Sequence, residues 1–120
     1  MAARFLVGID LGTTNSALAY IDSSERPRVL HDFPMPQLVG PGDMAARPTL
    51  PSRHHHVCEH ELPAGATRLP WTPEGSVAPD FVVGELARSQ SQAVPGRVIA
   101  SAKSWLCHSR VDRLQDILPW

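Results

Sequence analysis

The residues best suited to chemistry lie near the N-terminus, in the stretch "IDLGTTNS" at positions 9–16. Asp10 ends an apolar run, and its carboxylate can hold a cation. Gly12 lets a ligand approach the main chain, and the residues after it offer hydroxyls, an amide and consecutive backbone N–H groups that can form an anion site. A carboxylate beside an anion site suits Mg²⁺ that carries phosphate oxygens. The same residue types also make up an ordinary hairpin turn, and no Gly-Lys-Ser/Thr of a P-loop follows.

The elements that must position this motif are three short strands. Residues Arg4–Asp10 are apolar on both faces, which predicts a central strand. Ser16–Asp22 alternates between its two faces as a second strand, and Pro27–Asp32 forms a short third one. Because the connections are short, we expect an antiparallel meander with the motif at the tip of its first hairpin.

The rest of the chain divides into an irregular segment and a structured end. Nine of the 12 prolines lie in 33–79, which predicts a Pro-rich irregular insertion with one short edge strand near "TLPSRHHHVC". "DFVVG" predicts a strand, and "ELARSQSQ" a helix. A second helix is expected over "RVIASAKSWLCH", whose apolar residues fall on one helical face, and a third over Val111–Leu118.

Composition limits the class of protein. The net charge of −1, from 11 basic and 12 acidic side chains, gives no electrostatic basis for binding nucleic acid. No apolar run reaches the roughly 18 residues of a membrane span, and the N-terminal residues lack the apolar core of a signal peptide. Two cysteines are too few for a disulfide framework. We therefore expect a cytoplasmic protein with no membrane or nucleic-acid partner.

The stretch "IDLGTTNSALAYID" resembles the first phosphate-binding hairpin of the actin-like ATPase superfamily, and "GTTNS" resembles in particular the DnaK-type heat-shock (70 kDa) chaperones. Three later stretches resemble further elements of that family in the same order. "PTLPS" at 48–52 is similar to its "RTTPS", "FVVGELARSQSQ" to its "VGxxAxxQ", and "VPGRVIASAKSWL" to its "NPxNTxxxxKRLIG". The resemblance is close at 6–22 and looser afterwards, and the long 33–79 segment indicates a divergent bacterial-type branch.

The resemblance implies an α/β chain with a ribonuclease-H-like, actin-like ATPase fold. Residues 1–120 would be the N-terminal portion of its first lobe: a mixed sheet that starts with the three-stranded meander, and flanking helices. It also implies that ATP or ADP and Mg²⁺ are bound. The residue matching Asp10 holds Mg²⁺ through water, and the one matching Lys103 orients the attacking water. The residues that would contact the phosphates are Gly12, Thr13, Thr14 and Asn15.

The activity implied for the parent protein is ATP hydrolysis that drives cycles of binding and release of unfolded polypeptide clients, with co-chaperones as partners. The family's second phosphate loop, adenosine site and peptide-binding domain find no match, so we expect a partial nucleotide-binding domain without turnover of its own. Two alternatives stay open. One is a sugar or acetate kinase with the same hairpin, against which Asn15 argues. The other is a nucleotide-binding scaffold that does not hydrolyse ATP. This alternative stays open because a lone lysine such as Lys103 is commonly a solvated surface charge and not a catalytic group.

A second group of chemically capable residues occupies the middle of the chain. The potential zinc ligands there are His54, His55, His56, Cys58 and His60. No second ligand pair follows at a zinc-finger spacing, and the surroundings are rich in proline. We therefore expect a solvated loop without tightly bound zinc. Cys107, at the apolar end of the second expected helix, is predicted to be a small buried hydrophobe.

Overall fold

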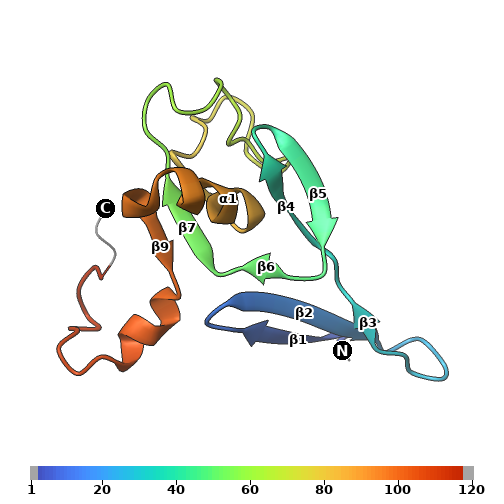
Figure 1. Cartoon of the computed structure of the whole chain (residues 1–120). Coiled ribbons are helices and arrows are strands. Elements are labelled where there is room, and N and C mark those ends of the chain that lie inside the picture. The colour runs from blue at the N-terminus through green and yellow to red at the C-terminus, as the bar shows by residue number, and fades with distance from the viewer. Residues whose placement is uncertain (1–2, 118–120) are drawn as a thin grey trace.

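The computed structural model describes residues 3–117. The N-terminal sheet is an antiparallel meander of β1 (Phe5–Leu11), β2 (Asn15–Asp22) and β3 (His31–Asp32), and the short β6 (Leu50–Pro51) pairs with the start of β2 (Figure 1). The predicted meander is therefore confirmed, although its third strand is shorter than expected. In the β1–β2 register Leu11 lies opposite Ser16, which leaves residues 12–15 as the turn, and Asn15 already pairs with β6.

The segment 33–79 is not irregular throughout, because it contains four strands. β4 (Met35–Gly40) and β5 (Asp43–Arg47) form an antiparallel hairpin around Pro41 and Gly42, and β6 and β7 (Arg53–His56) follow. Gly42 adopts a φ of 70°, which suits glycine in a tight turn. Pro36 is tolerated in β4 because a two-stranded hairpin leaves one side of each strand without ladder bonds.

A second small sheet carries the core of the molecule. Its strand order is β8 (Phe81–Val83), β7, β9 (Val98–Ala100), and α1 (Glu85–Ala93) packs against it. β8 and α1 confirm the predicted strand and helix. The stretch 49–58, predicted to hold one short edge strand, holds two strands: β6 pairs only with β2, whereas β7 is central because it pairs on both sides. The core cluster consists of Leu38, Val82, Leu86 and Ala87.

The start of α1 is fixed by a buried glutamine from β4. Gln37 is 3% exposed; its Oε1 accepts a hydrogen bond of 2.9 Å from the Glu85 N–H, and its Nε2 donates one of 2.9 Å to the Thr49 carbonyl. Gly84 adopts a φ of 77°, and a Cβ there would lie 2.7 Å from Gln37 Oε1. Glycine therefore allows the close approach that ties α1 to β4 and to the segment before β6.

The C-terminal region differs most from the prediction. The expected helix over 97–108 is replaced by a 3₁₀ turn η1 (Pro95–Arg97), the strand β9 and a second 3₁₀ helix η2 (Ala102–Cys107). The β-branched Val98 and Ile99 pair with the open side of β7, and this tertiary pairing overrides the helical periodicity. Cys107 is exposed rather than buried. Residues 111–117 are not helical, and Leu118 lies outside the described residues.

The core lies away from β1 and β2, whose surroundings are open. All seven residues of β1 are exposed, and β1 pairs with β2 alone among residues 3–117, so in the described part of the chain β1 is an edge strand and not the central one that was predicted. The radius of gyration is 17.0 Å, against about 14 Å for a typical domain of this length. The coarse α/β class is confirmed, but the described strand pairs are all antiparallel and lie in three separate sheets, not in one mixed sheet. No helix within the described residues is long and apolar enough to cross a bilayer.

Candidate functional site

The turn between β1 and β2 presents the predicted binding residues at the surface. Thr13, Thr14 and Asn15 are exposed, and Gly12 is half-buried. A Cβ built at Gly12 would overlap the carbonyl oxygen of Asn15, so this position has room only for glycine. The turn is thus narrow, and a ligand can reach its backbone from solvent.

Lys103 lies against this turn although it is far away in the sequence. Its Nζ donates a hydrogen bond of 2.7 Å to the carbonyl oxygen of Leu11, across 92 positions. Lys103 belongs to η2, and the chain enters η2 through Ser101 with a left-handed φ of 55°. The sequence contains no other lysine. The predicted lysine and the predicted phosphate turn are therefore neighbours in space.

Ser52 holds the turn in place, a role that the residue-by-residue sequence analysis did not assign. Its Oγ donates to the Gly12 carbonyl at 2.8 Å, and its backbone N–H donates to the Thr14 carbonyl at 2.8 Å. Its own carbonyl accepts from the Ser101 N–H at 3.2 Å. Ser52 thereby links the turn to the segment that carries Lys103. The available signal was the short stretch "PTLPS", which ends at this serine.

A groove of about 560 Å³ runs from the turn toward the second sheet. Gly12, Ser16 and Lys103 lie at its polar end, and Leu50, Val83 and Ile99 contribute to its apolar wall. His54 also lines the groove and stacks on Phe81 with ring centroids 4.9 Å apart. Burial, and then the neighbouring histidines, lower the pKa of His54, so its imidazole is mainly neutral at pH 7.

Asp10 lies on the opposite face of the hairpin from Leu11 and Ser16, because side chains alternate along a strand. It is exposed and borders a hollow of about 450 Å³ together with Asp32 and Pro48. Asp10 and Lys103 form no ion pair in the described part of the chain. The two residues predicted to be catalytic therefore flank the turn without touching each other.

The donor set at the turn fits a hydrated Mg²⁺ bound to phosphate. Within residues 3–117 no group of three or more His, Cys, Asp or Glu side chains could enclose a metal ion. Mg²⁺ bound to a nucleotide does not need such a cage, because it keeps several waters and takes only one or two carboxylates beside phosphate oxygens. Asp10 can supply that carboxylate, and the exposure of Thr13, Thr14 and Asn15 leaves the turn accessible to the phosphates.

The histidine cluster is not a solvated loop, because its first three members form most of β7. His55 is fully buried, and its Nε2 lies 2.7 Å from Glu61 Oε1. Burial favours the neutral form of Glu61, but the Cys58 N–H, His55 and Arg97 together outweigh it and leave the pKa of this carboxyl lowered. Arg97 Nη1 donates to Glu61 Oε2 at 2.8 Å. These contacts are structural, since they fasten β7 to the loop after it and to η1.

The arrangement at the turn can hold an anion and, beside it, a hydrated cation. Exposed hydroxyls, turn N–H groups and one ammonium group are available to an anion, and one carboxylate lies on the opposite face of the hairpin. Comparison with known proteins identifies no family: no family model matches the sequence, no curated protein is significantly similar to it, and no solved structure matches it significantly.

Proposed function

We propose that the hairpin at 10–16 binds the phosphates of Mg²⁺-ATP and that the chain is a nucleotide-binding part of a DnaK-type, ATP-dependent chaperone. One observation carries this proposal: Lys103 Nζ lies 2.7 Å from the Leu11 carbonyl, directly at the turn. A lysine brought to a Gly-Thr-Thr-Asn turn from 92 positions away is an arrangement that phosphate binding uses and that a plain hairpin does not need.

Each residue at the turn has a distinct role in the proposed site. The hydroxyls and backbone N–H groups of Thr13 and Thr14, with the amide of Asn15, donate to phosphate oxygens. Lys103 would exchange its Leu11 carbonyl for a phosphate oxygen and neutralise charge there. Asp10 would hold Mg²⁺ through its water shell. When bound, the ion supplies charge neutralisation between the phosphate groups.

The exposure of the site implies weak binding by these 120 residues. A charge pair at 4 Å contributes about 1 kcal/mol in bulk water and several times more where water is excluded. The turn residues 13–15 and Lys103 are exposed. We therefore assign tight binding, ATP hydrolysis and the cycle of polypeptide binding and release to a longer protein that closes the site from the other side.

The single lysine allows a direct test. Lysine labelled with ¹³C gives one side-chain NMR signal, which should shift on titration with Mg²⁺-ATP or with tripolyphosphate, with a Kd of about 1 mM or weaker. Adenosine, which lacks phosphates, should leave the signal unchanged. Thr13→Ala should weaken the response, whereas Thr72→Ala, in a distant loop, should not. The proposal would be contradicted if the lysine signal does not shift with either phosphate ligand at a ligand concentration 10 times this Kd of about 1 mM.

A nucleotide-binding scaffold without turnover is a second candidate, and one observation favours it. Asp10 lies on the hairpin face away from the groove that Lys103 lines. Hydrolysis requires the cation and the lysine to act on the same phosphate group. Phosphate release by the longer protein separates the two candidates, since both bind Mg²⁺-ATP but only the ATPase turns it over.

A further inference from the structure

The outer edge of β1 is the longest open strand edge of the first sheet. The other edge of β2 is occupied by β3 and β6, whereas β1 pairs only with β2 within residues 3–117. Figure 1 shows no strand beside β1 on the side away from β2. Natural sheets blunt such edges with charged residues, proline or bulges. The sequence "FLVGIDL" contains no lysine or proline, carries a single charge at Asp10 and pairs without a bulge.

The backbone groups on this edge belong to alternate residues. The carbonyl of Arg4 accepts from the Ser23 N–H at 2.7 Å, so even-numbered residues of β1 exchange hydrogen bonds with β2. The N–H and C=O groups of Phe5, Val7 and Ile9 consequently point outward. The bond from Lys103 to the Leu11 carbonyl agrees with this direction, because Leu11 is the next outward-facing residue.

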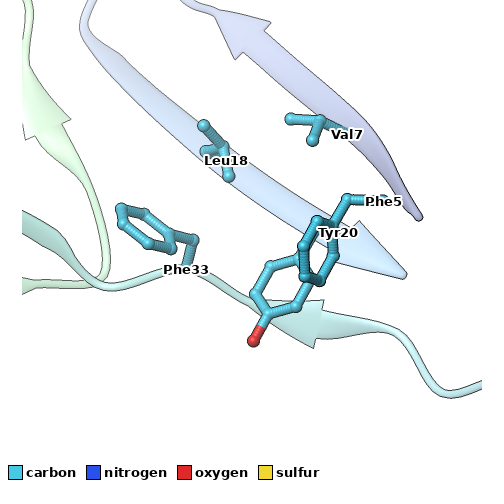
Figure 2. A pocket seen from close by; sticks show the side chains of 5 residues that line it. All are labelled: Phe5, Val7, Leu18, Tyr20 and Phe33. Atoms are coloured by element: carbon cyan, nitrogen blue, oxygen red, sulfur yellow. The ribbon is translucent and has the colours of Figure 1, made fainter. Parts of the chain in front are cut away.

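The side chains of the same residues form an exposed apolar strip. Phe5, Val7 and Ile9 are 47%, 56% and 62% exposed. Phe5 and Val7 continue into an apolar hollow of about 350 Å³ whose other walls are Leu18, Tyr20 and Phe33 (Figure 2). An open edge that also carries apolar side chains is suited to pairing with another strand.

We infer that β1 pairs antiparallel with β1 of a second copy of this chain, in a two-fold register centred on Val7. In that register Phe5 of each copy lies opposite Ile9 of the other, and all three outward-facing residues exchange backbone hydrogen bonds. Arg4 of each copy, which pairs with Asp22 of its own chain at 3.2 Å and is still 72% exposed, then lies opposite Asp10 of the other, so opposite charges meet at both ends. A register centred on Gly8 would instead require the Leu11 carbonyl, which Lys103 already engages.

The two-fold symmetry makes the assembly close at the dimer. Each copy contributes the same edge of β1, and in the dimer both of these edges are hydrogen-bonded, so neither can pair with a third copy. The two apolar strips become neighbours in one continuous sheet face. Residues 12–15 of the phosphate turn lie beyond the paired residues, so pairing leaves the turn itself open. Asp10 is the one residue that the pairing shares with the proposed nucleotide site.

Sedimentation equilibrium of the 120-residue chain tests the inference. The wild-type chain should show a concentration-dependent monomer–dimer equilibrium. Val7→Lys places two like charges opposite each other on the axis and should raise the dimer Kd at least tenfold. The matched control is Val77→Lys, since Val77 is 92% exposed in a distant loop and should leave the equilibrium unchanged. A wild-type monomer at all concentrations, or a Val7→Lys dimer of unchanged affinity, would overturn the inference.

Residue-resolved amide hydrogen exchange keeps the test decisive if Val7→Lys does not fold. In the wild-type chain the amides of Phe5, Val7 and Ile9 should be protected at high concentration and exchange rapidly after dilution. Those of Leu6, Gly8 and Asp10, which face β2, should stay protected in both conditions. Dimers in which the three outward amides exchange rapidly would place the interface elsewhere and refute the pairing.

Discussion

The ammonium group of Lys103 donates a 2.7 Å hydrogen bond to the carbonyl oxygen of Leu11. This one contact joins the two parts of the sequence that were expected to act on phosphate. It depends on the β7–β9 pairing, which brings residues 98–100 beside β7, and on Ser52, which links the Ser101 backbone to the hairpin turn.

Ser52→Ala should loosen the turn. The substitution removes the hydroxyl that donates to the Gly12 carbonyl at 2.8 Å, and a lost hydrogen bond of this kind costs about 1 kcal/mol of unfolding free energy. Urea denaturation measures this loss, and the lysine NMR titration should show weaker binding of tripolyphosphate. Ser104→Ala, at an exposed position of η2, is the control and should change neither quantity. If the two variants have the same unfolding free energy and the same affinity for tripolyphosphate, Ser52 has no role in the site.

Gly12→Ala should disrupt the turn more severely. The added methyl group would overlap the Asn15 carbonyl oxygen, so the backbone of residues 12–15 must move. We expect a loss of about 1–3 kcal/mol in unfolding free energy and no detectable phosphate binding. Gly96→Ala is the matched control, because nothing lies within 4 Å of a Cβ there. A fully stable Gly12→Ala variant that still binds tripolyphosphate would contradict the role of the narrow turn.

Asp10→Asn should remove the dependence of ATP binding on Mg²⁺. The amide keeps the shape of the side chain but loses the charge that attracts a hydrated cation. In the longer protein we expect turnover to fall at least about 100-fold. Asp32→Asn changes the other carboxylate of the same hollow and should leave the Mg²⁺ dependence intact. If Asp32→Asn abolishes that dependence and Asp10→Asn does not, the cation belongs to Asp32.

Glu61→Gln should make the free energy of unfolding depend less steeply on pH in the acidic range. The pKa of Glu61 is lowered in the folded chain from its ordinary value of 4.5, because the opposing effect of burial is outweighed by the Cys58 N–H, His55 and Arg97. Its ionised form therefore stabilises the fold above pH 4.5, and this contribution is lost as the pH falls through the folded-state pKa. The variant should be less stable at pH 6 and should lose less stability between pH 4.5 and 3.

Thermal unfolding followed by circular dichroism across this pH range measures the effect. Glu59→Gln is the control, since Glu59 is 90% exposed and its ion-pair partner in the described part of the chain is an equally exposed His60 at 3.6 Å. That variant should reproduce the wild-type curve. If Glu61→Gln loses as much stability as the wild-type chain between pH 4.5 and 3, other carboxyls are responsible for the acid sensitivity, such as Asp22 with its lowered pKa.

Local patterns in the sequence were sufficient for some elements of the fold. The alternation at 16–22 and the turn residues between two apolar runs predicted the β1–β2 hairpin, and "DFVVG" and "ELARSQSQ" predicted β8 and α1. In the hairpin and in α1 the stabilising bonds join residues close in sequence, so the pattern and the structure agree. β8 pairs with the distant β7, and its apolar run was a sufficient signal without that partner. β9 was missed because the same residues that trace one face of a helix found an open strand edge at β7.

For the candidate site, the sequence by itself determined which residues form the turn and that residue 12 had to be small. Which groups surround that turn was decided only by the tertiary structure. Ser52 and Lys103 lie 40 and 92 positions from their hydrogen-bond partners, and Asp10 faces away from both by strand alternation. Contacts of such separation depend on how β6, β7 and β9 pair, and no local pattern encodes that pairing.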